Sequence, residues 1–246
     1  MDYAIEVSGL TKFFPSGNNI PLSLPCCFRK PEIKAVVNNV SFQVGEGRGF
    51  GLIGPNGAGK STLMRMLCCL ILPSAGTARV AGYDTLRQEI QIKKVIGFVS
   101  GQERSFYWRL TGRQNLDFFA GLYGLRRREV RQKINDLCGL LGIEEPDKRF
   151  QEYSAGMKQR LALARSLLHN PRILFMDEPT KSLDPWCAEK LRFFIKDSLV
   201  RQKKMTVLLA THDLAEAGEL CEYAALMEAG AIKACGRTEE VLKGLV

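Results

Sequence analysis

A glycine-rich segment at residues 54–62 has the residue types and spacing needed to hold a triphosphate. It follows the P-loop pattern G-x-x-x-x-G-K-[ST], in which backbone N–H groups curl around phosphate oxygens. Lys60 can reach the β- and γ-phosphates, and the Ser61 hydroxyl can ligate Mg²⁺. We therefore predict a nucleoside triphosphate site made by Gly54, Pro55, Asn56, Gly57, Ala58, Gly59, Lys60, Ser61 and Thr62.

The residues on either side place this segment between a strand and a helix. Residues 49–53 form an apolar run typical of a buried strand. Apolar side chains then recur at helical spacing until Pro73, namely Leu63, Met66, Leu67, Leu70 and Ile71. A helix that begins at the P-loop would add the positive partial charge of its N-terminus to the phosphate site.

Two neighbouring carboxylates, Asp177 and Glu178, follow the apolar run 173–176 directly. Ligands of open α/β sheets bind at the carboxyl ends of the strands, so this pair should meet the triphosphate. Asp177 can anchor Mg²⁺, which prefers oxygen ligands. Glu178 can polarise a water for attack on the γ-phosphate. A surface turn without function is the alternative interpretation.

The composition is that of an ordinary globular protein, with 246 residues, 46% hydrophobic and 25% charged. This length suits one large domain, or a core with a subdomain. No secretory signal is visible, and the longest apolar run, 63–72, is shorter than the ~20 residues of a membrane span. We therefore expect a soluble chain that acts on a membrane only through a separate partner.

The net charge of +9 permits contacts with nucleic acid or an anionic membrane. Most basic residues alternate with acidic or apolar ones, which favours a scattered, solvated surface. The densest cluster, 126–128 with Arg131 and Lys133, predicts an exposed helix face, with an RNA or lipid contact as the alternative. The 8 cysteines form no C-x-x-C pair, which favours reduced thiols in a cytosolic compartment over structural zinc.

The rest of the chain alternates between strand and helix patterns. Unbroken apolar runs, typical of strands in a parallel sheet, lie at 95–99, 173–176 and 206–210. Strands of alternating or hairpin character are predicted at 4–7, 40–44, 77–81, 223–227 and 231–235. The segment from Thr111 to about His169 is nearly all helical in pattern. We therefore predict one α/β domain (1–246) with a helical subdomain at about 104–168 and some antiparallel strands.

A Pro-rich insertion at about 15–34 separates the first two predicted strands. Its centre, from Pro15 to Pro31, is loop-like and long for a compact domain. A flexible insert is the favoured interpretation. A contact with a partner or a membrane surface is the alternative.

Five further segments match, in order and spacing, the motifs of a known family, and the chain resembles the ATP-binding cassette ATPases. The segments are Phe14 as the adenine-stacking aromatic, Gln102 as the Q-loop glutamine, 153–160 as the signature motif, 182–184 as the D-loop and His212 as the switch histidine. The resemblance covers essentially the whole chain. It implies a P-loop NTPase (RecA-like) core with an antiparallel β subdomain, the cofactors ATP and Mg²⁺, and ATP hydrolysis.

The resemblance also implies that each site is completed by a second copy of the chain. Ser154 can cap a helix whose N-terminus presents free N–H groups, and Gly156 lets backbone approach phosphate closely. In the family this surface, with the D-loop residue Asp184, meets ATP held by the other subunit of a homodimer. The implied catalytic residues are Lys60, Gln102, Glu178 and His212. The implied Mg²⁺ ligands are Ser61, Gln102 and Asp177.

The signature motif begins Tyr-Ser-Ala-Gly-Met, where the commonest family form begins Leu-Ser-Gly-Gly-Gln. It resembles a variant frequent in the ATPases of exporters, which favours export. The aromatic run Phe106, Tyr107 and Trp108 lies beside the Q-loop, where transport ATPases receive a helix of the membrane subunit. We interpret this run as a permease docking surface, with packing inside the helical subdomain as the alternative.

The leading hypothesis is thus the ATP-hydrolysing subunit of a transporter. It would be cytoplasmic and held at the inner face of the cell membrane by an integral membrane permease. The alternative is a non-transport cassette ATPase that acts on ribosomes or nucleic acid. Nucleic acid is the less favoured partner because such proteins usually carry two cassettes in one chain, and this chain has one.

Overall fold

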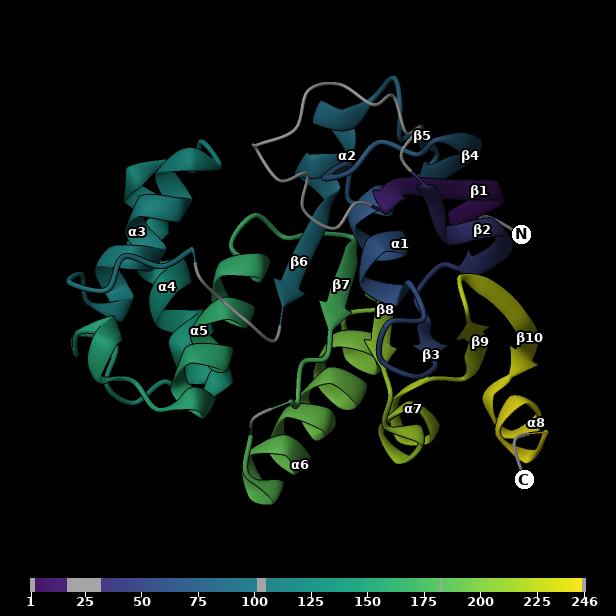
Figure 1. Ribbon diagram of the computed structural model, residues 1–246. Coiled ribbons are helices and arrows are strands. Elements are labelled where there is room, and N and C mark those ends of the chain that lie inside the picture. Colours follow the sequence, from purple (N-terminus) through teal and green to yellow (C-terminus); the bar gives the residue numbers. More distant parts are fainter. Residues whose placement is uncertain (1–2, 17–31, 101–104, 182, 245–246) are drawn as a thin grey trace, which may run out of the picture.

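The computed structural model describes residues 3–16, 32–100, 105–181 and 183–244. Figure 1 shows two sheets on one side of the molecule and a separate group of helices, α3 to α5, on the other. Within the described part of the chain, none of the helices combines the length and the apolar character that a membrane span requires.

A six-stranded sheet forms the centre of the molecule, in the order β10-β9-β3-β8-β7-β6. Its strands are β3 (Gly49–Ile53), β6 (Ile96–Ser100), β7 (Ile173–Asp177), β8 (Thr206–Thr211), β9 (Tyr223–Glu228) and β10 (Ala231–Arg237). All residues of β3, β7 and β8 are buried, as unbroken apolar runs predict. Parallel pairing sets Ile53 beside Thr211 and Asp177 beside Ala210, so these three strands end at one edge of the sheet.

A second, antiparallel sheet has the order β2-β1-β4-β5. Its strands are β1 (Tyr3–Ser16), β2 (Glu32–Gly45), β4 (Ala75–Val80) and β5 (Tyr83–Asp84). The strands predicted at 4–7 and 40–44 are therefore too short, and both ends of the predicted insertion at 15–34 are paired strand, with Pro15 opposite Ile33. Register shifts between Val7 and Phe13 interrupt the two-residue alternation on which the prediction depended. The central part of the insertion, 17–31, lies outside the described residues.

The helices of the core are α1 (Lys60–Leu67), α2 (Glu89–Val95), α6 (Pro185–Phe193), α7 (Leu214–Leu220) and α8 (Thr238–Lys243). A π-helical segment, Phe194–Gln202, continues α6. The prediction that α1 reaches Ile71 is wrong, because Cys69 adopts a left-handed conformation (φ 56°) and the Leu70 N–H bonds back to the Arg65 carbonyl at 2.8 Å. This is a helix-ending motif that usually uses glycine, so the cysteine hid it in the sequence.

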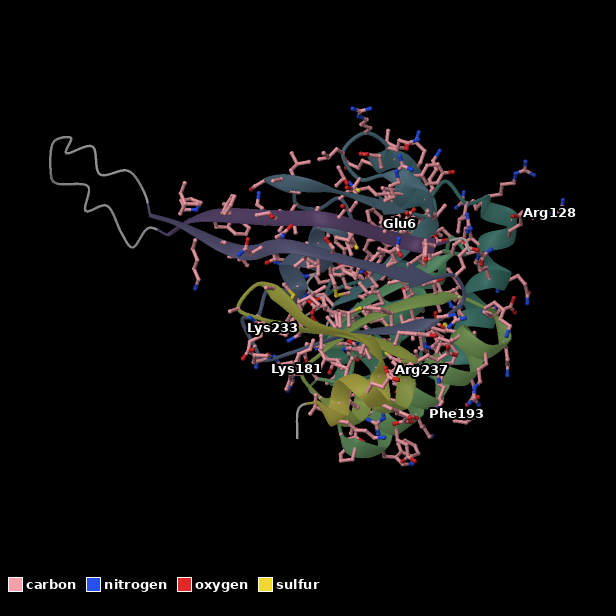
Figure 2. The ribbon with its side chains drawn as sticks, turned by 90° about the vertical axis from the view of Figure 1, so that its right-hand side faces the viewer. Glu6, Arg128, Lys181, Phe193, Lys233 and Arg237 are labelled. Carbon is pink, nitrogen blue, oxygen red and sulfur yellow. The ribbon has the colours of Figure 1, made fainter. Side chains whose placement is uncertain are left out.

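The helical subdomain lies between β6 and β7 and contains α3 (Gly112–Leu122), α4 (Arg127–Leu141) and α5 (Ala155–Leu167), with a short 3₁₀ turn at Phe150–Glu152. The apolar side of α4 is buried, as its periodicity predicts, through Val130, Ile134, Leu137 and Leu141. The arginines at 126–128 are exposed, and Figure 2 shows Arg128 projecting outward from the molecule. One hydrophobic core joins this subdomain to one face of the central sheet, and a second core lies on the other face, against the antiparallel sheet.

Candidate active site

The P-loop joins β3 to α1 and forms the floor of a cavity of about 510 Å³. Polar and charged side chains reach it from α1 with its preceding loop, from the end of β6, and from the end of β7 and the segment after it. The residues around it are Val36, Asn56, Gly57, Ala58, Gly59, Lys60, Ser61, Thr62, Arg65, Ser100, Asp177, Glu178 and Lys181. The structure therefore brings together the predicted phosphate-binding loop and both predicted carboxylates.

The shape of the loop depends on glycine at Gly54 and Gly59. Both have positive φ, 152° and 102°. A Cβ on Gly54 would lie 2.0 Å from the Met227 carbonyl oxygen, and one on Gly59 would lie 2.4 Å from the Val36 carbonyl oxygen. Because these neighbours are backbone atoms, the loop can follow this path only without side chains at the two positions.

Lys60 is 5% exposed and is folded onto its own loop. Its Nζ donates to the carbonyl oxygens of Gly54 at 2.5 Å and Pro55 at 3.0 Å. Burial lowers the pKa of this ammonium, and the nearby charges of Glu178 and Asp177 oppose that shift. The cation is thus held at the cavity wall, where a phosphate group would replace the carbonyl partners.

Ser61 and Asp177 lie side by side in the cavity wall, and the serine hydroxyl donates to the carboxylate Oδ1 at 3.0 Å. Asp177 is buried, which raises the pKa of its carboxyl, while the Ser61 hydrogen bond and Arg65 lower it. A hydroxyl and a carboxylate on adjoining walls are oxygen donors of the kind that Mg²⁺ takes beside phosphates. The donor set therefore fits Mg²⁺, and Ser61 with Asp177 would hold it.

Glu178 and His212 form a pair at the ends of β7 and β8. The His212 Nδ1 lies 2.7 and 2.8 Å from the two carboxylate oxygens of Glu178. Glu178 has a left-handed backbone (φ 51°), and its N–H donates to the Ala210 carbonyl at 2.9 Å. This unfavourable conformation of a non-glycine residue turns the carboxylate toward the cavity, which is a feature typical of functional sites.

The predicted signature and D-loop residues lie elsewhere, at the starts of α5 and α6. The Ser154 hydroxyl accepts from the Met157 N–H at 3.2 Å, and the Asp184 carboxylate accepts from the Cys187 N–H at 2.9 Å. Both residues cap their helices, as the sequence predicts for Ser154, and both are exposed. Neither they nor Gly156 line the P-loop cavity of the same chain.

Phe14 also lies away from the cavity lining. It pairs with Lys34 between β1 and β2, and the Lys12 ammonium lies 5.1 Å from the centre of its ring. The cavity wall on the β2 side includes Val36, which no sequence pattern indicates because its place depends on long-range strand pairing. Gln102 and the D-loop residue Ser182 lie outside the described residues.

Of the three aromatic residues beside the Q-loop, Phe106 is buried and only 4% exposed. Its ring contacts those of Phe119 and Phe150 in the core of the helical subdomain. Tyr107 and Trp108 are 50% and 61% exposed. Phe106 is therefore a core residue, and only its two neighbours present a surface.

The sequence and the fold agree with one known family. A model of the ABC transporter family matches residues 37–181, which is more than half of the chain. The chain belongs to the ABC transporter family. It is 35% identical over 213 residues to the ABC transporter ATP-binding protein NatA of Bacillus subtilis, covering 86% of each chain.

Another relative and a solved structure agree with this assignment. The cassette is 38% identical over 214 residues to the Nod factor export ATP-binding protein I of Rhizobium etli, covering 87% of this chain and 67% of that protein. Its fold matches a dimeric post-hydrolysis state of the ATP-binding cassette MJ0796 bound to ADP and Pi, with a TM-score of 0.81 and 25% identity over 95% of this chain and 98% of that one. The cassette is accordingly an ATPase, with the P-loop NTPase fold that the sequence predicts.

Proposed function

We propose that two copies of this cassette close around two ATP molecules and thereby drive export through a separate membrane permease. The observation that carries the proposal is the separation of the two half-sites. Lys60, Asp177 and Glu178 line one cavity, whereas the exposed Ser154 and the half-buried Gly156 lie at the start of α5, away from it. An exposed helix N-terminus with free N–H groups binds phosphate well, so a second chain can supply the nucleotide.

In the closed dimer, Glu178 acts as the general base that polarises the attacking water, and His212 holds the Glu178 carboxylate through its 2.7 Å contact. Lys60 leaves its carbonyl partners and binds the phosphates. Bound Mg²⁺ neutralises charge on the phosphate oxygens. Gln102 completes the proposed metal ligands and links the site to the permease, and Phe14 stacks on adenine.

Tyr107 and Trp108 are the proposed contact with the permease. Tyr107 packs edge-on against Phe118 of α3, with ring centres 4.9 Å apart, and Phe118 is itself 39% exposed. An exposed group of aromatic rings is typical of the anchors of protein interfaces. Such docking would place the cassette at the cytoplasmic face of the membrane.

Export is favoured over import by the signature variant at 153–160 and by the relative named for Nod factor export. The two relatives are named as ATP-binding proteins of a transporter and of an export system, which favours transport over action on ribosomes. A transport role does not require an RNA contact at the exposed arginines 126–128, which are then a solvated helix face.

A co-purification experiment tests this proposal. The tagged cassette is expressed in its own host, extracted in mild detergent, and the bound proteins and RNA are identified. We expect an integral membrane permease to co-purify. For the double variant Tyr107→Ser/Trp108→Ser, the amount of recovered permease should fall by about tenfold or more. Trp186→Ser is the matched control, because Trp186 is equally exposed (60%) on α6. Recovery of ribosomal RNA without a permease would favour the ribosomal alternative instead.

A further inference from the structure

Glu216 is a buried carboxylate that none of the steps described above uses. It lies on α7, is 1% exposed, and does not line the P-loop cavity. Burial raises the pKa of its carboxyl, and hydrogen bonds from Thr211 and Thr180 oppose that shift. Burying a carboxyl is unfavourable unless its oxygens are hydrogen-bonded, so these two hydroxyl partners account for its presence.

The two partners belong to different strand ends, each next to a residue of the active site. Thr180 follows the end of β7, two residues after Glu178, and its Oγ1 donates to the Glu216 Oε1 at 2.8 Å. Thr211 ends β8, directly before His212. One carboxylate therefore joins the segment that carries Glu178 to the segment that carries His212.

The helix that carries Glu216 is itself tied to its surroundings. The Asp213 carboxylate accepts from the N–H groups of Ala215 and Glu216 at 2.9 and 3.2 Å. The Asp213 N–H in turn donates to the Thr211 hydroxyl at 3.0 Å. At the far end, Glu219 forms a partly exposed ion pair with Arg192 of α6 at 2.7 Å, which contributes little to the position of the helix. Because the start of α7 is bonded to the end of β8, the Glu216 carboxylate has a defined position relative to the two threonines.

Thr180 also leads toward the second half-site. Its carbonyl accepts from the Leu183 N–H at 3.0 Å, and Asp184 follows as the cap of α6. The Glu216–Thr180 bond thus fixes the point from which the chain leaves Glu178 and enters the D-loop.

We propose that Glu216 is a positioning residue for hydrolysis. It acts through Thr180 and Thr211 to keep the Glu178 carboxylate and the His212 ring in fixed relative positions. This inference rests on the proposed roles of Glu178 and His212. Glu216 contacts neither residue in the described structure, so its effect is on the geometry of the pair. A small displacement of a general base lowers kcat without a matching change in nucleotide affinity.

The test compares Glu216→Ala, Glu216→Gln and Thr180→Val in steady-state ATP hydrolysis, with KM for ATP and the melting temperature measured for each. We expect Glu216→Ala and Thr180→Val to lower kcat roughly tenfold to a hundredfold, with KM nearly unchanged. Glu216→Gln should recover most of kcat, because its amide oxygen still accepts the Thr180 hydrogen bond. In the double variant Glu216→Ala/Thr180→Val, kcat should fall little below that of Glu216→Ala, because Glu216→Ala already removes the bond that Thr180→Val removes.

Glu219→Gln is the matched control, because it alters a carboxylate on the same helix that faces α6 instead of the strand ends. It should leave kcat near that of the parent. A Glu216→Ala variant that hydrolyses ATP at the parental rate would overturn the inference, even if it melts earlier. Equal losses with Glu216→Ala and Glu216→Gln, or fully additive losses in the double variant, would do so as well. Parental turnover by Glu178→Gln would instead refute the proposed base, and so the two failures are distinguishable.

Discussion

The P-loop side of this cassette (residues 54–62 with Asp177 and Glu178) and its signature side (Ser154 and Gly156 at the start of α5) differ in how many functional side chains each brings together. Around the P-loop, a lysine, a serine and two carboxylates from distant parts of the chain converge on one cavity. At the signature, Ser154 caps α5 and stands exposed, and no residue of the P-loop cavity accompanies it. In Figure 1 the two regions lie on different parts of the fold, with α5 on the side of the helical subdomain.

The difference indicates which functions one chain can perform alone. The P-loop side has a buried cation, a metal-compatible oxygen pair and a candidate base, so it is equipped to bind ATP without help. The signature side offers the Ser154 hydroxyl and the first N–H groups of α5, which can bind a phosphate that is brought to them. Under the proposed function, a reaction that requires both sides needs a second copy of the chain.

The largest expected effect is that of Glu178→Gln on the P-loop side. Glutamine keeps the size of the side chain but cannot take a proton from water, so turnover should fall at least about a hundredfold. ATP should still drive dimer formation, because the amide leaves Lys60 and the signature surface unchanged. Turnover is measured by phosphate release and dimerisation by gel filtration with ATP. Hydrolysis at the parental rate would show that Glu178 is not the base.

The next effect concerns the backbone shape of the P-loop, which we expect to depend on the absence of a side chain at Gly54. Gly54→Ala should lower the free energy of unfolding by about 3 kcal/mol or more, since its Cβ meets the Met227 carbonyl at 2.0 Å. Gly57→Ala is the matched control, with positive φ (82°) but no atom within 4 Å of the new Cβ. We expect it to cost about 1–2 kcal/mol. Urea unfolding measures both, and equal losses would mean that the close approach at Gly54 is unimportant.

The smallest effects are on stability at two helix caps. Ser154→Ala and Thr111→Ala each remove a side-chain cap and should each lower the free energy of unfolding by about 1 kcal/mol. Only Ser154→Ala should also lower ATP turnover, by roughly tenfold, because only Ser154 is proposed to meet a charged phosphate. A matching loss of turnover in Thr111→Ala would indicate that capping, and not phosphate contact, explains the effect.

The sequence predicts the P-loop side well because its signals are local. The motif at 54–62, the apolar strand before it and the carboxylates after 173–176 each depend on neighbouring residues, and the structure joins them as expected. Most of what the sequence missed or left open depends on contacts between distant segments. Val36 reaches the cavity through the pairing of β2, and Phe106 is buried by rings from Phe119 and Phe150. Cys69 ends α1 in a conformation normally signalled by glycine.

The most direct test of the shared site mixes two variants, Lys60→Ala and Ser154→Arg. Each should be inactive alone, because both sites of its dimer lack one half. In an equal mixture about half of the dimers are mixed and contain one intact site, so we predict recovery of about a quarter of the parental turnover. Hydrolysis that never rises above the average of the two separate variants would contradict a site divided between two chains.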